Sequence, residues 1–343
     1  MKLQWASNFD DIGNALGYTT HQKNLKKALE NAGVEITDDA KVAVTIITPE
    51  CFIPVPDKFN ILYTMYECTS IPDHWIKPLQ TADMLVVPCT HNKKLFRRYY
   101  KGPIEVCWEG VDVEKFTYKE RKKNNPFIFL WVGASNPRKG YEHVVESWRR
   151  FTAKHPMWPC ILYMKTTQKT RPERFEQVGP DAYIDTRLLP LEKEEEANVN
   201  IPSLIELYHM ANAFLLPSMG EGFGLTLAEA MATGLPCIYT PWSGPVDFCS
   251  HKEGYPVKWE FTKVRTVGIN QKGEPTGEIR SESKAASADP DSIVNEMERI
   301  ILEYEYALSK GKKASERIRR DITWEKSAAS FIKIVEKFTK EKL

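Results

Sequence analysis

Short apolar runs that alternate with amphipathic stretches are the feature that most limits what this chain can fold into. The runs FIFLWV at Phe127–Val132 and AFLLP at Ala213–Pro217 are continuously apolar, as expected for strands covered on both faces. Strands separated by helical patterns indicate parallel sheets built from β-α-β units. The fold class predicted from this alternation is therefore α/β. The expected strands are Lys2–Ala6, Val42–Ile47, Asn60–Met65, Met84–Pro88, Ile104–Cys107, Phe127–Val132, Ile161–Met164, Ala213–Pro217 and Cys237–Tyr239, and the expected helices include Thr20–Ala32, Lys139–His155 and Leu225–Ala232.

A charged, polar segment divides this pattern in two. Thr117–Asn125, TYKERKKNN, has no apolar periodicity and is predicted to be an interdomain linker. A length of 343 residues also suits two domains. The cleft between two such α/β halves is the default place for a ligand. Val264–Pro290 is expected to be a hairpin or a loop insertion, and about the last 50 residues have a helical pattern.

Composition narrows the function. The net charge is +1, whereas a chain that wraps nucleic acid usually carries a clear basic excess. We see neither a signal peptide nor an apolar stretch of about 18 residues, so a cytoplasmic protein is expected. The seven cysteines are dispersed and indicate buried thiols rather than disulfides or a zinc site. The histidines have no metal-ligand spacing, and no D-x-D motif lies near a strand end in the first half; no metal is expected.

The segment Pro217–Pro236, PSMGEGFGLTLAEAMATGLP, carries the most chemistry. A strand ends at Pro217, a glycine-rich loop follows, and a helix opens at about Leu225. Such a loop brings backbone N–H groups to a helix N-terminus, where the dipole also favours anions, and so predicts a phosphate cradle. Glu221 and Glu229 lie beside this cradle, and carboxylates there suit a ligand that also offers sugar hydroxyls.

This segment resembles the donor-site signature of retaining glycosyltransferases of the large family four, which have the GT-B architecture. The resemblance implies two Rossmann-like domains facing across a cleft, with residues 1–120 on the acceptor side, 121–322 binding the donor and a C-terminal helix at 323–343 crossing back to the first domain. It also implies that Glu221 contacts donor-sugar hydroxyls, that Glu229 binds the ribose, and that the N–H groups of Phe223 to Thr226 hold the diphosphate. The matching residues are Pro217, Ser218, Glu221, Gly222, Phe223, Gly224, Leu225, Glu229, Ala230, Met231, Ala232, Gly234 and Pro236.

Other loops supply further expected site residues. Gly133 follows a strand and precedes Arg138 and Lys139, which are placed to neutralise a diphosphate. The family's usual arginine position is Ala134, so Arg138 would substitute for it. Gly17, in the loop before the first helix, is expected near the donor phosphates. Glu67 is the best match to the polar residue that the family points at the reacting end of the sugar, with a structural glutamate as the alternative.

The expected reaction is metal-independent transfer, with retention, from a nucleoside-diphosphate sugar to an acceptor hydroxyl, with Glu221, Glu67 and Lys139 as catalytic residues. The acceptor stays open: a glycan, a lipid-linked glycan, a metabolite, a protein or a hydroxylated DNA base. A non-catalytic nucleotide-sugar-binding subunit is the main alternative; an epimerase or a phosphorylase is a weaker one. The basic, aromatic stretch Lys93–Lys101 could contact an anionic membrane or nucleic acid, or be an ordinary solvated helix face.

Overall fold

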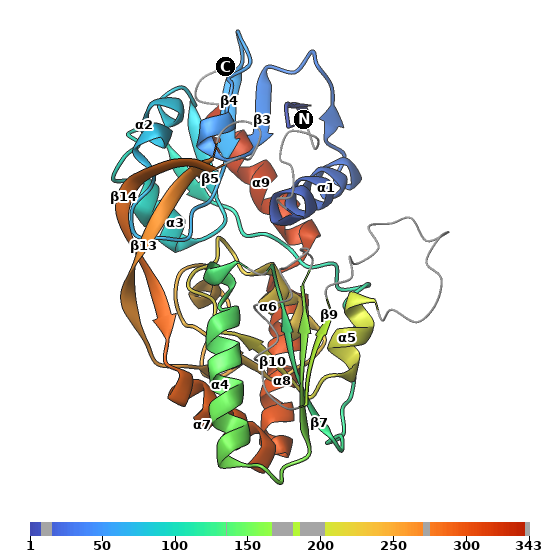
Figure 1. Cartoon of the computed structure of the whole chain (residues 1–343). Helices are drawn as coiled ribbons and strands as arrows, with labels where there is room; N and C mark the ends of the chain where they lie inside the picture. The colour runs from blue at the N-terminus through green and yellow to red at the C-terminus, as the bar shows by residue number, and fades with distance from the viewer. Residues whose placement is uncertain (8–15, 135, 167–180, 186–202, 270–274, 340–343) are drawn as a thin grey trace.

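The computed structural model describes residues 1–7, 16–134, 136–166, 181–185, 203–269 and 275–339. It consists of two α/β halves, one above the other in Figure 1, each built around a parallel sheet. The predicted α/β class is confirmed. The predicted strand Phe127–Val132 and helix Leu225–Ala232 have the same bounds in the structure.

The first sheet contains the strands of the N-terminal half, and every pairing in it is parallel. Its order is β2-β1-β3-β4-β5-β6. In parallel sheets the carboxyl ends of the strands lie at one edge, so the segments that follow β4, β5 and β6 share the edge toward the second half. The bounds are β1 Lys2–Trp5, β2 Glu35–Ile36, β3 Val42–Ile46, β4 Phe59–Tyr63, β5 Met84–Val87 and β6 Ile104–Val106, with α1 Leu16–Asn31, η2 Pro49–Cys51, α2 Asp73–Leu79 and α3 Thr90–Phe96 around them.

The second sheet is also parallel, in the order β12-β11-β10-β7-β8-β9. Its core is rich in aromatic rings; Trp131 and Trp148 are almost wholly buried. The bounds are β7 Phe127–Val132, β8 Cys160–Lys165, β9 Ala182–Asp185, β10 Ala213–Leu216, β11 Cys237–Tyr239 and β12 Tyr255–Pro256, with η3 Pro137–Lys139, α4 Tyr141–Lys154, α5 Leu204–Met210, α6 Leu225–Ala232 and η5 Gly244–Asp247 between them.

The chain ends in three helices, α7 Pro290–Leu302, α8 Tyr304–Asp321 and α9 Trp324–Thr339. α7 and α8 pack on the second half, whereas α9 rises into the first half beside α1 (Figure 1). Trp324, Phe331 and Val335 of α9 share an apolar core with Leu25 of α1 and with β3. The predicted return of the C-terminal helix to the first domain is confirmed.

The expected insertion at Val264–Pro290 is a long antiparallel hairpin of β13 Trp259–Ile269 and β14 Pro275–Ala288. It begins earlier than expected and reaches from the second half to the side of α2 in the first (Figure 1). Near its base it docks on the N-terminal half: the Thr69 N–H donates to Lys284 O at 3.0 Å, and Ser283 Oγ donates to Ser70 O at 3.0 Å. The hairpin of the second half is therefore hydrogen-bonded to the first half.

Three segments differ from expectation. α1 begins at Leu16, so Gly17 lies in its first turn and not in the preceding loop; Gly13 lies outside the described residues. α3 ends at Phe96, so Lys93–Lys101 is not one helix face. Within the linker Thr117–Asn125, Arg121 is not simply solvated, because its guanidinium donates to Tyr208 O and Thr233 Oγ1, both at 3.0 Å.

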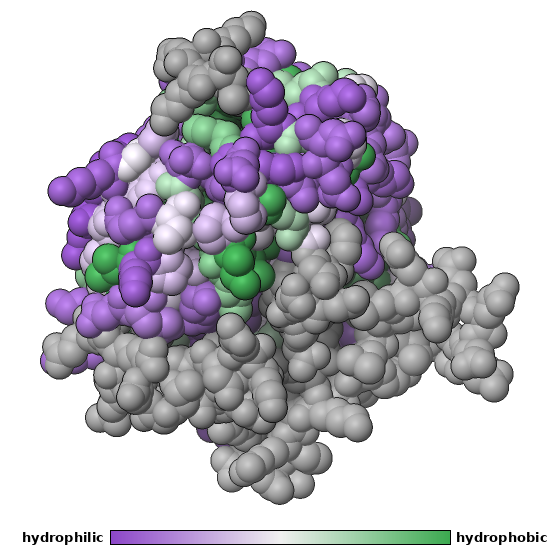
Figure 2. Space-filling model, turned by 90° about the horizontal axis from the view of Figure 1, so that it is seen from above, coloured by the Kyte–Doolittle hydropathy of each residue, from purple (hydrophilic) through white to green (hydrophobic). Residues whose placement is uncertain are grey.

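The exterior is mostly polar. Seen from above in Figure 2, hydrophilic residues dominate the described surface, and hydrophobic residues form only small, separate spots. Within the described ranges, none of the helices has the length and apolar character needed to cross a bilayer. Lys93 pairs with Glu105 at 3.0 Å, and Arg97 and Arg98 donate to the backbone carbonyls of Gly102 and Thr69, which leaves fewer cations of Lys93–Lys101 directed at solvent than the sequence suggests.

Candidate functional site

Two loops of the second half are packed backbone to backbone at the carboxyl ends of β7 and β10. The Met219 N–H donates to Arg138 O at 2.7 Å. Gly140 has a φ of +73° and no room for a side chain, since a Cβ there would lie 2.0 Å from Pro217 O. Only glycine meets both conditions without strain. The close approach brings the Arg138-Lys139 pair against the loop that carries Glu221.

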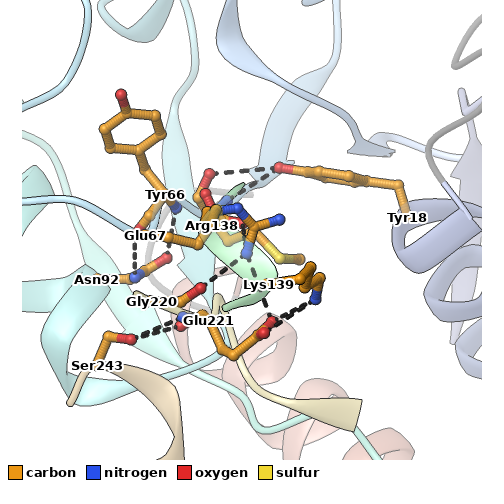
Figure 3. Close-up of polar contacts among 10 residues, drawn as sticks. Tyr18, Tyr66, Glu67, Asn92, Arg138, Lys139, Gly220, Glu221 and Ser243 are labelled. Atoms are coloured by element: carbon orange, nitrogen blue, oxygen red, sulfur yellow. Dashed lines mark hydrogen bonds and ion pairs between the residues drawn. The ribbon is translucent and has the colours of Figure 1, made fainter. Parts of the chain in front are cut away.

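The Glu221 carboxylate is held by two cations (Figure 3). Lys139 Nζ lies 3.0 Å from Glu221 Oε1 and 2.7 Å from Oε2. Arg138 Nη1 lies 3.5 Å from Oε2 and donates to Gly220 O at 2.7 Å. Only 6% of the Glu221 side chain is exposed. A buried carboxylate needs such partners, because an unpaired charge in that position is costly.

Glu67 joins this cluster from the first half, where it follows β4. Its Oε1 lies 3.3 Å from Arg138 Nη1. Burial lowers the pKa of Arg138, but the carboxylates of Glu67 and Glu221 outweigh it and keep that pKa above its ordinary value. A Cβ on Gly220 would lie 2.4 Å from Glu67 O. The two halves are thus in direct contact at the predicted site, and four predicted residues meet there: Glu67, Arg138, Lys139 and Glu221.

The start of α6 lies directly after this loop. Gly224, with φ +110°, precedes the helix, and the first N–H groups of any helix lack partners within it. Thr226 Oγ1 is buried and has no hydrogen-bond partner among the described residues. Phe223 anchors the loop, because its ring packs on Phe248 with centroids 4.8 Å apart. The predicted N–H groups of Phe223 to Thr226 are therefore at a helix N-terminus, which favours an anion.

Glu229 occupies the second turn of α6. Tyr208, which is wholly buried, donates from its hydroxyl to Glu229 Oε2 at 3.2 Å. Burial raises the pKa of Glu229 to about 7, although the bond from Tyr208 and the nearby Lys115 act in the opposite direction. A carboxyl group with a pKa near 7 is partly protonated at neutral pH, so it can both accept and donate a hydrogen bond.

The remaining predicted residues lie around this cluster. A Cβ on Gly133 would lie 3.4 Å from Lys139 Cβ, so Gly133 borders the lysine. Gly17 is exposed at the start of α1. Its neighbour Tyr18 accepts from the Met65 N–H at 3.2 Å, which ties α1 to the segment that carries Glu67. No group of three metal-ligand side chains is placed to hold an ion in the part of the chain that the structure describes.

Three residues of this region were not predicted as site residues: Tyr208, Ser243 and Glu109. Ser243 follows β11, and Glu109 follows β6. Both therefore lie at carboxyl ends of parallel strands, where ligands of open α/β sheets bind. If this rule had been applied to every predicted strand, and not only to those that match the family signature, it would have found Ser243 and Glu109. Tyr208 has no such signal, because it acts from inside α5 on a residue 21 positions away.

The fold agrees with that of known proteins. Sucrose-phosphate synthase from Thermosynechococcus elongatus superposes with a TM-score of 0.63 at 17% identity, over 96% of this chain and 81% of that one. A glycosyltransferase from Rickettsia africae superposes with a TM-score of 0.61 at 14% identity, over 99% and 98%. Two facing parallel-sheet domains with a returning C-terminal helix define the GT-B architecture, and this chain has it.

Sequence comparison gives the family. Residues 126–260 match the family described as Glycosyl transferases group 1. The UDP-Gal:alpha-D-GlcNAc-diphosphoundecaprenol alpha-1,3-galactosyltransferase of Escherichia coli is 23% identical over 60% of this chain and 55% of its own length. A D-inositol 3-phosphate glycosyltransferase of Geodermatophilus obscurus is 24% identical over 64% and 45%. The chain thus matches about half the length of these relatives. Over residues 126–260, the chain is therefore similar to the group 1 glycosyltransferases.

Proposed function

We propose that this chain is a retaining glycosyltransferase that moves a sugar from a nucleoside-diphosphate sugar to an acceptor hydroxyl. The observation that carries the proposal is the cluster of Lys139, Arg138 and Glu221 at the N-terminus of α6, within the region that matches the family. It combines cations and helix N–H groups for a diphosphate with a buried carboxylate for sugar hydroxyls. The E. coli relative, named as using UDP-Gal, is consistent with such a donor.

In the reaction, the bond between the sugar C1 and the β-phosphate oxygen breaks. The acceptor oxygen bonds to C1 on the same face, and its proton passes to the leaving phosphate. Negative charge grows on the diphosphate, and Lys139, Arg138 and the N–H groups at Phe223–Thr226 stabilise it. We propose that these groups take the place of a divalent cation, so that the enzyme needs no metal and no cofactor besides its donor.

In this proposal, each carboxylate contacts a different part of the donor. Glu221 accepts hydrogen bonds from sugar hydroxyls once Lys139 turns toward the diphosphate. Glu229, held by Tyr208, binds the ribose. Glu67 reaches the cluster from the other half and is placed to position the sugar or the acceptor. The acceptor itself remains open among a glycan, a lipid-linked glycan, a metabolite, a protein and a hydroxylated DNA base.

Two substitutions test the donor assignment. Glu229→Gln should weaken nucleoside-diphosphate affinity about tenfold, the loss expected for a charge-assisted hydrogen bond. Lys139→Ala should lower kcat about a hundredfold, because it removes a cation from the leaving group. Calorimetry and a donor-hydrolysis or transfer assay measure the two effects, after a thermal-shift screen of UDP-, GDP-, ADP- and TDP-sugars has identified the donor.

Glu146→Gln and Lys154→Ala, both on exposed parts of α4, are the matched controls and should leave both quantities unchanged. Wild-type values for both site variants would refute the donor site. Tight binding without any turnover, with every acceptor class supplied, would instead favour the non-catalytic subunit.

A further inference from the structure

Ser243 has a backbone conformation that a serine rarely adopts. It follows β11 in the segment leading to η5, is 2% exposed, and has φ 57° and ψ −127°. A non-glycine residue held in such a region is strained. Glycine would adopt the same angles without this strain. Strain that persists in a buried loop beside a candidate site calls for a reason, and the side chain supplies it.

The Ser243 hydroxyl bonds to both main-chain groups of Glu221 (Figure 3). Its Oγ accepts from the Glu221 N–H at 2.9 Å and donates to Glu221 O at 3.0 Å. The next residue adds to this contact, because the Gly244 N–H donates to Glu221 O at 3.1 Å. Glu221 itself lies in neither helix nor strand. The segment after β11 therefore supplies backbone partners that regular secondary structure would otherwise supply.

The direction of the Glu221 carboxylate depends on this contact. Its Cα is fixed from one side by Ser243 and Gly244, and its carboxylate is fixed from the other by Lys139. When a diphosphate draws Lys139 away, the contacts of Ser243 and Gly244 still hold the backbone of Glu221. Without the contacts of Ser243 and Gly244, the loop could rotate. The Glu221 carboxylate would then no longer be at the right position to accept from a bound sugar.

We propose that Ser243 is a positioning residue that sets the Glu221 carboxylate for the hydroxyls of the donor sugar. This inference rests on the proposed function. The inference distinguishes recognition of the sugar from recognition of the nucleotide. In the proposed function, Glu229, Lys139 and the start of α6 bind the ribose and the diphosphate. The Ser243 hydroxyl contacts none of these groups. Loss of the hydroxyl should therefore affect recognition of the sugar far more than recognition of the nucleotide.

Ser243→Gly is the decisive variant, because it relieves the backbone strain while it removes both hydrogen bonds. We expect an unchanged or higher thermal midpoint, a kcat/KM for the nucleoside-diphosphate sugar reduced about tenfold, and an affinity for the nucleoside diphosphate alone within about twofold of wild type. Ser243→Ala keeps the strain and loses the bonds, so its kcat/KM should fall by a similar factor. Ser250→Gly, in the next loop of the same domain, is the control and should match wild type in kcat/KM and in affinity for the nucleoside diphosphate.

Three results would count against the inference. A wild-type kcat/KM for Ser243→Gly would overturn it. So would an equal loss of affinity for the nucleoside diphosphate and for its sugar, since Ser243 would then merely stabilise the loop. If wild-type protein binds no nucleoside-diphosphate sugar from the panel, the proposed function fails and this inference fails with it; if wild type binds and turns over the donor, only the positioning role is being tested.

Discussion

At the level of single residues, a buried acid, Glu109, lies beside a buried imidazole, His21. Glu109 is 3% exposed and His21 is fully buried, and Glu109 Oε1 lies 3.5 Å from His21 Nδ1. Burial, and secondarily the charge of Glu221, raises the pKa of Glu109 to about 8. Burial lowers the pKa of His21 to about 3. Between these values the pair is neutral, a protonated acid beside an uncharged ring.

This state predicts a dependence of stability on pH. The folded protein keeps the Glu109 proton up to about pH 8, whereas the unfolded chain loses it near the ordinary value of 4.5. The folded state therefore binds more protons in that window, and this contribution to stability falls as pH rises through it. Glu109→Gln cannot titrate. The thermal midpoint of the variant should rise relative to wild type from pH 4.5 to 8 and then keep a constant difference.

Calorimetric or circular-dichroism melts between pH 5 and 9 measure this difference. Glu336→Gln, at an exposed position of α9, is the control and should follow the wild-type profile. A Glu109→Gln curve parallel to wild type over the whole range would show that Glu109 is ionised in the folded protein.

At the level of helices and strands, α8 packs so closely on the end of α6 that Gly311 of α8 has no room for a side chain. A Cβ on Gly311 would lie 2.2 Å from the backbone oxygen of Gly234. Ser315, one turn further along, donates to Ala232 O at 2.6 Å. The close contact joins the helix of the donor loop to the C-terminal helices, so the loop's position depends on residues about 90 positions away.

Gly311→Ala should therefore destabilise the protein, opposite to the usual effect. In an exposed helix interior this change stabilises by about 1 kcal/mol. Here the obstacle is backbone, which yields little, and overpacking of that kind costs about 1–3 kcal/mol. We expect a net loss of about 1–2 kcal/mol in the free energy of unfolding, measured by urea denaturation. Lys312→Ala, exposed on the same helix, should stay within about 0.5 kcal/mol of wild type; a Gly311→Ala variant as stable as that control would refute the packing argument.

In the whole molecule, several separate contacts join the two halves. Asp247 of η5 accepts from the Thr90 N–H at 2.8 Å and from Trp108 Nε1 at 3.2 Å. The hairpin β13–β14 docks at Thr69 and Ser70. The ion pair of Arg138 with Glu67 joins the two halves as well. The structure is therefore that of a molecule with its halves in contact at the donor loop.

Gly220→Ala tests how that contact limits the arrangement of the halves. The added Cβ would meet the backbone oxygen of Glu67, in the opposite half, at 2.4 Å. The halves should then stay further apart, so the radius of gyration in small-angle scattering should increase and donor turnover should fall. Gly17→Ala is the control for shape, because a Cβ there has nothing within 4 Å. An unchanged scattering curve for Gly220→Ala would show that the loop yields instead of the interface.

From the sequence alone, most of the helices and strands and the glycine-rich loop before α6 could be predicted. Continuous apolar runs such as Phe127–Val132 identified buried strands, since local hydrophobicity reports burial on both faces. The glycines and glutamates of Pro217–Pro236 predicted a cradle and its helix, because loop, cap and helix are neighbours in the chain. The two-residue strands β2 and β12 were missed, because two residues carry no periodic signal, and the four-residue strand β9 was missed as well.

Which side chains come into contact follows from the packing of the folded chain. Lys139 and Glu221 are 82 positions apart, and Ser283 and Ser70 are 213 apart. Ser243 lies outside the signature altogether, yet its hydroxyl bonds to both main-chain groups of Glu221. Local propensities carry no information about such contacts, because they form only when the sheets have assembled and the two halves have docked. The sequence therefore predicted which side chains a donor would need, and the packing of the folded chain sets how those side chains are held.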